Sequence, residues 1–267
     1  MNGFPASIIL CNGKYYKLKP TEGDNIMSTV INYQLSIFGK FSILPTPDAI
    51  SKLMAGINQE TQKIMLPNMI TSQQIEIPSN RISAISNLGF ITQDQMYNIA
   101  ILNDRIDVTY NKVNDADVNQ DEFYSFAVKA LSVIIDYASI VANRLAANVQ
   151  YICEMADFDT MRAKGKGILK NAAYYDGKDY AEWSLRTNAL DSVNINDADE
   201  GINVITDISS AQNAAGKALI AFHIDINTLP QNTNLRFGKE ALVPFVEGIT
   251  PIASRIATDV ERLVVGE

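Results

Sequence analysis

The chain has 267 residues, of which 47% are hydrophobic, so it can form a sizeable packed core. Its formal net charge of −8 argues against general affinity for nucleic-acid phosphates or anionic lipid surfaces, because both need clustered Lys and Arg side chains. Only two cysteines are present, Cys11 and Cys153, which is too few for a disulfide scaffold and favours free thiols in a reducing cytoplasm.

Residues 1–26 predict an N-terminal hairpin followed by a polar linker. Asn12-Gly13 stands between two short apolar runs, a pattern typical of a type I′ turn. We do not expect an export signal, because the segment lacks a basic start. No later stretch predicts a transmembrane helix either, since charged residues interrupt the most apolar helical run.

Residues 27–148 predict a first unit made of a strand, a short helix, a meander and a long helix. Apolar residues alternate with polar ones from Ile31 to Ile37, as in a strand with one buried face. Thr46-Pro47-Asp48 is typical of a helix start. The predicted elements are a strand over 31–37, a helix over 47–56, strands over 73–77, 82–91, 96–102 and 105–110, and a helix from about 121 to 145.

Residues 149–267 predict a second unit with a similar plan. The predicted elements are strands over 149–154, 180–186, 202–208 and 217–226, a short helix over 157–162, and a final helix. Pro244 and Pro251 lie in that helix, and each removes a backbone donor. We therefore expect a kink or break near residues 248–251, with Thr250-Pro251 as a possible new helix start.

The two units also share a sequence repeat. Phe126–Leu145 aligns without gaps on Phe237–Ile256, and each segment follows a similar strand-like tetrapeptide, Arg105–Val108 or His223–Ile226. The identical pairs are Phe126/Phe237, Ala130/Ala241, Leu131/Leu242, Ala142/Ala253 and Arg144/Arg255. A period above 100 residues indicates two similar half-domains. We therefore predict an α+β fold of two related half-domains, each an antiparallel meander sheet packed by a long C-terminal helix.

Three residues are candidates for catalysis. His223 is the only histidine, and Asp225 follows it on the same face of a predicted strand, where its carboxylate could orient the ring. Asp107 occupies the matching place in the first unit, so Asp107 and Asp225 could form an acid pair near a pseudo-twofold axis. The favoured interpretation is structural: a polar histidine on a strand, and two carboxylates that accept backbone hydrogen bonds.

Basic and aromatic residues of the second unit are candidates for binding. The basic cluster surrounds Gly165 and Gly167 and could hold an anionic partner, although a flexible basic turn is the favoured interpretation. It consists of Arg162, Lys164, Lys166 and Lys170. Trp183 is either an interface anchor or, more commonly for a tryptophan on a strand, a core residue.

We expect neither a metal nor a cofactor. Residues 114–121 resemble the opening of an EF-hand loop, with oxygen ligands at alternate positions. Gln120 stands where the loop needs glycine, and Phe126 stands where it needs a bidentate glutamate. A solvated loop that leads into a helix is the better interpretation.

Several short segments carry a family resemblance. Residues 75–80 (IEIPSN), residues 102–108 (LNDRIDV), residues 146–153 (AANVQYIC) and Asp225–Thr228 follow one another in a familiar order. In this order the chain resembles a sporadically distributed group of bacterial and phage proteins of unknown function, which implies no particular catalytic residues. Each half is also similar in layout to the export chaperone SecB, and that resemblance implies binding of extended polypeptide.

The leading hypothesis is a non-enzymatic protein that binds a protein or peptide partner through an exposed sheet edge or an apolar groove. It would act as a chaperone-like or accessory component in the cytoplasm, with homo-oligomers possible. One alternative is an enzyme or small-ligand-binding protein that uses a cleft between the two lobes. Another is a structural component that assembles with itself.

Overall fold

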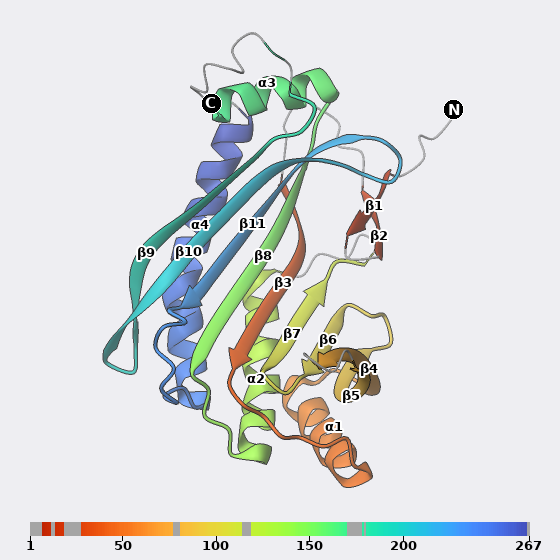
Figure 1. The fold of residues 1–267 in the computed structure, drawn as a ribbon, viewed down its shortest axis with the longest axis vertical. Coiled ribbons are helices and arrows are strands. Elements are labelled where there is room, and N and C mark those ends of the chain that lie inside the picture. Colours follow the sequence, from red (N-terminus) through yellow and green to blue (C-terminus); the bar gives the residue numbers. More distant parts are fainter. Residues whose placement is uncertain are drawn as a thin grey trace.

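The computed structural model describes residues 7–11, 14–18, 28–76, 81–113, 119–169, 178 and 180–265. These residues form an α+β fold with a nine-stranded antiparallel sheet, four α-helices and a separate two-stranded hairpin (Figure 1). In chain order the elements are β1 (Ser7–Cys11), β2 (Lys14–Leu18), β3 (Ser28–Phe38), α1 (Pro47–Thr61), β4 (Met65–Glu76), β5 (Arg81–Thr92), β6 (Tyr97–Ile101), β7 (Arg105–Asn111), α2 (Gln120–Ala138), β8 (Arg144–Glu154), α3 (Phe158–Ile168), β9 (Ser184–Ile195), β10 (Ala198–Gln212), β11 (Ala218–Thr228), the 3₁₀ helix η2 (Lys239–Ala241) and α4 (Leu242–Val265).

The strand order in the large sheet is β4-β5-β6-β7-β3-β8-β11-β10-β9. The two strands at its centre, β3 and β8, are each followed by a helix and then by a meander. Each meander starts at an outer edge and returns until its last strand, β7 or β11, pairs with β3 or β8. A long helix, α2 or α4, then follows. The element order is thus similar on both sides of the β3–β8 pair, although the first meander has four strands (β4–β7) and the second has three (β9–β11).

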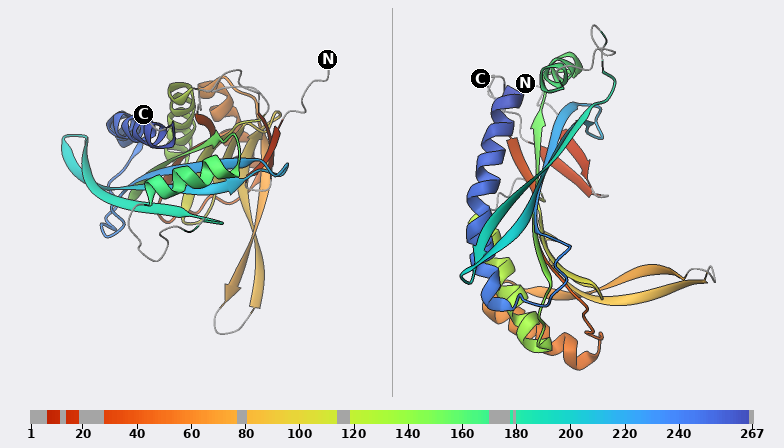
Figure 2. Two further views of the ribbon diagram at one scale, coloured as in Figure 1. Left: turned by 90° about the horizontal axis from the view of Figure 1, so that it is seen from above. Right: turned by 60° about the vertical axis from the view of Figure 1, so that its left-hand side comes forward.

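Three helices cover one face of the sheet. α1, α2 and α4 lie side by side along this face, and the β4–β5 ribbon projects toward the opposite side (Figure 2). α3 lies at the end of the sheet, beside the C-terminal part of α4 (Figure 1). The main core fills the space between the sheet and the helices. We call the other face of the sheet, which these three helices leave uncovered, the open face.

The helix boundaries follow from local capping. Thr46 accepts a hydrogen bond from the backbone nitrogen of Ala49 at 3.2 Å, which confirms the predicted start of α1 at Pro47. Asn119 caps α2 through Glu122 at 2.7 Å. α2 ends where Ser139 adopts the left-handed conformation, with φ at 50°. The predicted end at residue 145 was therefore wrong, because β8 already begins at Arg144.

The gapless alignment of the two helical segments does not pair equivalent elements. Phe126 lies in α2, whereas Phe237 precedes η2 and forms an isolated β-bridge with Ala142. The alignment offset differs by 11 residues from the offset between the first residues of α2 and α4. Eleven residues make about three helical turns, so a shift of this size keeps the apolar stripe in phase. Similar spacing of apolar residues therefore produced the match.

The predicted break in the last helix is absent. α4 runs without interruption from Leu242 to Val265, with Pro251 inside it. Thr250 does not cap a new helix, because its hydroxyl donates to the carbonyl of Val246 at 2.8 Å within the same helix. The boundary predicted between residues 148 and 149 falls within β8, in the middle of the continuous sheet. The N-terminal hairpin has its strands at β1 and β2, while its turn lies outside the described residues.

Candidate functional site

The open face carries polar side chains because its strands alternate. On β3, Tyr33, Leu35 and Ile37 belong to the core under the helices. Gln34 and Ser36 point the other way and hydrogen-bond each other at 2.9 Å. A bulge between Val30 and Asn32 shifts the register. Because of this shift, Ile31 lies outside the main core and packs with Ile152 and Leu219 in a small separate apolar cluster.

Amide and carboxylate side chains of the open face form hydrogen bonds across the strands. On one side, Asn188 of β9 donates to Asn203 of β10 (3.3 Å), and Asn203 donates to Asn227 of β11 (3.2 Å). Within β11, Asn227 donates to Asp225 (3.0 Å). On the other side, Asn32 donates to Asn111 (2.9 Å) and Ser36 donates to Asp107 (2.7 Å). Such pairs fix the strand register and leave further amide donors and acceptors on the surface.

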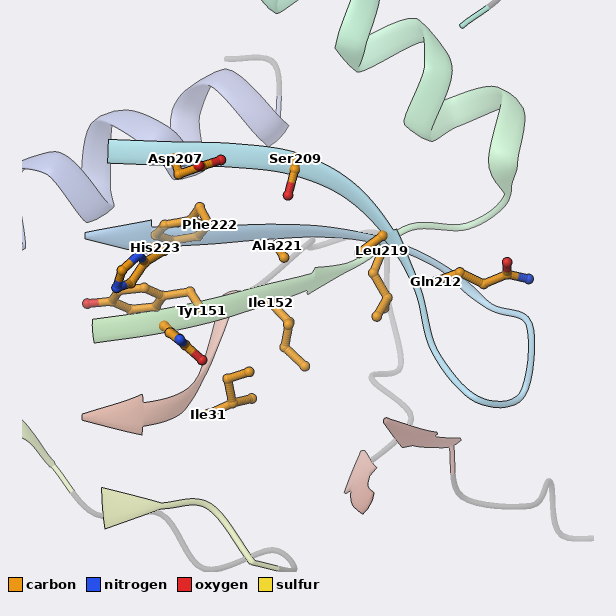
Figure 3. A pocket seen from close by; sticks show the side chains of 12 residues that line it. Ile31, Tyr151, Ile152, Asp207, Ser209, Gln212, Leu219, Ala221, Phe222 and His223 are labelled. Carbon is orange, nitrogen blue, oxygen red and sulfur yellow. The ribbon is translucent and has the colours of Figure 1, made fainter. Parts of the chain in front are cut away.

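A pocket of about 360 Å³ is formed on this face by β3, β8, β10 and β11 (Figure 3). One end of it is apolar and is lined by Ile31, Ile152 and Leu219, which form the small separate cluster. The other end is polar and is lined by Asp207, His223 and other polar side chains. The pocket is at the small end of the range of ligand sites. Its two ends suit an amphipathic group.

His223 occupies the polar end of the pocket. Its Nε2 lies 3.0 Å from Oδ1 of Asn148 on the neighbouring strand. Burial lowers the pKa of His223, and this effect outweighs the opposing influence of Asp225 and Asp207. The ring is therefore neutral at pH 7. In the tautomer whose Nε2–H donates to the amide oxygen of Asn148, Nδ1 is an acceptor. No described residue hydrogen-bonds to that second nitrogen.

None of the described cysteine and serine side chains considered as nucleophiles is hydrogen-bonded to His223. Cys153 belongs to the core on the helix side of the sheet, whereas His223 lies on the open face. Burial raises the pKa of Cys153 to about 12, so the thiol stays protonated. Ser209 lines the same pocket but lies diagonally across from His223 on the neighbouring strand, because its direct partner is Ala221. The described residues therefore form no hydrogen-bonded nucleophile and base pair around His223.

The two candidate aspartates share the open face but lie far apart. β3 and β8 lie between β7, which carries Asp107, and β11, which carries Asp225. Three strand spacings correspond to about 14 Å. Asp107 is held by Arg105 at 3.0 Å and by Ser36, while Asp225 accepts from Asn227. The structure therefore brings Asp225 near His223 and leaves Asp107 in a different setting.

The basic cluster lies on α3, so the expected flexible turn was wrong. Residues 158–168 are helical, with Asp157 as the N-cap, and Arg162 forms an ion pair with Asp159 at 3.2 Å. Lys164 and Lys166 lie on the same helix, and Lys170 lies outside the described residues. The backbone amides near Gly165 and Gly167 belong to this helix instead of an open phosphate-binding loop.

Trp183 is a core residue, in agreement with the favoured interpretation. Its side chain is 5% exposed and belongs to the main core. The backbone nitrogen of Trp183 donates to the hydroxyl of Ser210 at 2.9 Å, which ties the start of the β9 region to β10. The indole lies directly against Gly165 of α3. Trp183 therefore attaches α3 to the end of the sheet and is not available as an exposed anchor.

The two glycines of α3 provide a matched test of this packing. A Cβ added at Gly165 would lie 2.6 Å from Cδ1 of Trp183, whereas a Cβ at Gly167 meets nothing within 4 Å. We expect Gly167→Ala to stabilise the protein by about 0.5–1 kcal/mol through helix propensity. Gly165→Ala should instead destabilise it by about 1–3 kcal/mol through overpacking. Thermal unfolding followed by Trp183 fluorescence measures both. Equal stabilisation by the two changes would contradict this packing.

The described ranges contain neither a candidate metal cluster nor a candidate membrane-spanning helix. Within them, no three His, Cys, Asp or Glu side chains gather as a possible metal site. No helix there combines the length and apolar character that crossing a membrane requires. Residues 114–118, which contain most of the EF-hand-like segment, lie outside the described residues.

Sequence reasoning identified His223 and Asp225 but missed the pocket that His223 lines. The missing parts come from β8 and β10: Asn148, Gln150 and Asp207. A signal was present, because polar residues alternate with apolar ones around Asn148 and Gln150. Which strands are neighbours, and hence which polar faces join, depends on pairings across more than 70 residues. No family model matches the chain, and no curated protein is similar to it, so function must be argued from this geometry.

Proposed function

We propose that this protein is a non-enzymatic binding protein that holds an extended segment of a protein or peptide partner on the open face. One observation carries the proposal: a pocket with an apolar end and a polar end opens on a sheet face that α1, α2 and α4 leave uncovered. Apolar side chains would enter beside Ile152 and Leu219. Amides of this face such as the exposed Asn188 and the half-buried Asn203 would hydrogen-bond the partner's backbone.

The sheet edges support the same function. Among the described strands β9 pairs only with β10, so within this part of the chain the backbone groups along its outer edge have no strand partner. Leu190 on this strand is 75% exposed, and most other side chains of β9 are exposed as well. An unpaired strand edge can accept an extended peptide as an additional strand. A partner lying on the open face could therefore continue onto this edge.

We further propose that the chain arose by duplication of a unit comprising a strand, a helix, a meander and a long helix. The similar order of elements on both sides of the β3–β8 pair supports this origin, although the first meander has one strand more than the second. The support comes from this topology and not from the gapless alignment. Each unit keeps the layout that resembles SecB, which favours a chaperone-like or accessory role. The proposed setting is the reducing cytoplasm, and the buried thiol of Cys153 is compatible with it.

A peptide-binding titration with a blocking variant tests this function. Ala221 lines the pocket, whereas Val243 lies on α4 and is 47% exposed. We expect fluorescein-labelled extended peptides of apolar and uncharged polar sequence to show a higher anisotropy when they bind the full chain. Ala221→Glu should weaken binding at least about tenfold, which corresponds to about 1.4 kcal/mol. Val243→Glu is the matched surface control and should leave binding unchanged.

Three outcomes would contradict the proposal: no binding by any peptide, equal weakening by both variants, or unchanged binding by Ala221→Glu.

The pocket volume also favours a second candidate, a small-ligand-binding protein or enzyme, because about 360 Å³ suffices for a small molecule. A functional assay of His223→Ala would identify a catalytic role of the ring. Light scattering at several protein concentrations would identify self-assembly, which is the remaining alternative.

A further inference from the structure

We infer that the pocket at His223 takes a basic side chain of the bound segment, an ammonium or guanidinium group, with an apolar side chain two residues away entering the Ile152 end. This inference rests on the proposed peptide binding and specifies its chemistry. It is carried by the distribution of acceptors, apolar walls and charges around one pocket (Figure 3).

The polar end of the pocket offers acceptors. The carboxylate of Asp207 lies directly across from His223 in the strand register and accepts no hydrogen bond from the described residues. Nδ1 of His223 is an acceptor once Nε2–H is used by Asn148. Asp225 follows on the same strand face and accepts from Asn227. Lys and Arg side chains are pure donors, so they match this set.

The spacing of the two ends sets the spacing of the partner's residues. His223 and Leu219 lie four residues apart on β11, a distance of about 13 Å. Residues two apart on an extended segment project to the same side and lie about 6.8 Å apart. The distance between the two pocket ends exceeds the distance between the two partner residues. The long side chain of a lysine or arginine spans this difference, with its alkyl stem over Ala221. The recognised pattern is therefore basic, any residue, apolar.

The two arginines near this site do not occupy it. Arg186 lies opposite Asp207 on β9, but its side chain is exposed and makes no ion pair with the described part of the chain. Arg144 places its guanidinium 3.8 Å from the ring centre of Phe38. An anionic ligand would meet the carboxylate of Asp207 in the pocket wall, and that of Asp225 lies two residues beyond His223 on the same strand. The charges facing the pocket therefore favour a cation.

Competition between matched peptides tests the inference. The probes are an acetylated and amidated Ser-Lys-Ser-Leu-Ser peptide and the same peptide with norleucine or glutamate in place of lysine. We expect the lysine peptide to bind the full chain at least about tenfold more tightly than the norleucine peptide, which keeps the stem but lacks the charge. The glutamate peptide should bind more weakly than either, and the lysine advantage should decrease with added salt.

The protein variants separate the pocket from general charge. Asp207→Asn should remove most of the lysine advantage and leave the norleucine peptide unaffected. Asp199 lies on the same strand, β10, eight residues from Asp207. Asp199→Asn should therefore change the binding of neither peptide. If lysine and norleucine peptides bind equally, the inference fails while the proposed function stands. If neither binds, both fail. Pentylamine binding as tightly as the lysine peptide, with the same dependence on Asp207, would overturn peptide recognition in favour of a small amine.

Discussion

Arg236→Ala is expected to lower the free energy of unfolding by about 3–5 kcal/mol. Arg236 lies in the connection between β11 and α4, and its guanidinium holds both carboxylate oxygens of Glu200 at 2.8 and 3.1 Å. Both side chains are only 16% exposed. Removing the arginine would leave the carboxylate of Glu200 half-buried without its cation, which costs more than the lost attraction alone.

The same guanidinium organises the backbone around it. Nη1 donates to the carbonyls of Asn143, Asn232 and Asn234, and the group lies 4.2 Å from the ring centre of Phe237. It therefore fixes the connection that leads into α4. Urea unfolding followed by Trp183 fluorescence measures the decrease in the free energy of unfolding caused by Arg236→Ala.

Arg236→Lys is the control that separates charge from shape. Lysine keeps the positive charge but cannot reproduce the planar fork or the contacts of Nη1. We expect this variant to recover less than half of the lost stability. Full recovery by lysine would show that charge alone matters at this position, and a loss below about 1 kcal/mol for alanine would contradict the buried ion pair.

Phe123→Ala should cost about 3–5 kcal/mol through an internal cavity. Phe123 is fully buried at the start of α2, where its ring is stacked on Tyr33 of β3 at 5.3 Å between centroids and 15° between planes. Tyr124 lies against the same ring, also at 5.3 Å. Alanine would remove these contacts, and the rigid sheet below would not collapse to fill the space.

Phe123→Leu provides the comparison, because leucine conserves most of the volume and loses only the aromatic stacking. A cost of about 1–1.5 kcal/mol is expected for it. Equilibrium unfolding in urea measures both variants. Equal effects of alanine and leucine would contradict a cavity as the cause.

Most elements could be predicted from sequence because their patterns are local. The cap at Thr46, the alternation along β3 and the apolar stripe of α2 each depend on neighbours within a few residues. Strands β5, β6 and β7 were placed for the same reason, whereas the strand predicted over 73–77 covers only the end of β4, which begins at Met65. Most of β9 was missed, because an edge strand with nearly all side chains exposed shows no apolar alternation.

The candidate site was less predictable, because it depends on which strands become neighbours. His223 and Asp225 were recognisable as two residues on one strand face. The partners of His223 are Asn148, 75 residues earlier, and Asp207 on the preceding strand. No local pattern specifies these pairings. The matching positions of Asp107 and Asp225 in the sequence suggested an acid pair, but strands β3 and β8 lie between the strands that carry them.

The pairing of β3 with β8 has a consequence for synthesis of the chain on the ribosome. β3 obtains its second neighbour only when residues 144–154 have emerged, more than 100 residues after β3 itself. Until then a strand containing Val30, Tyr33 and Leu35 has one bare side, which invites association between nascent chains. Slow release of β8, for example by a cluster of rare codons before it, should therefore increase aggregation of newly made protein.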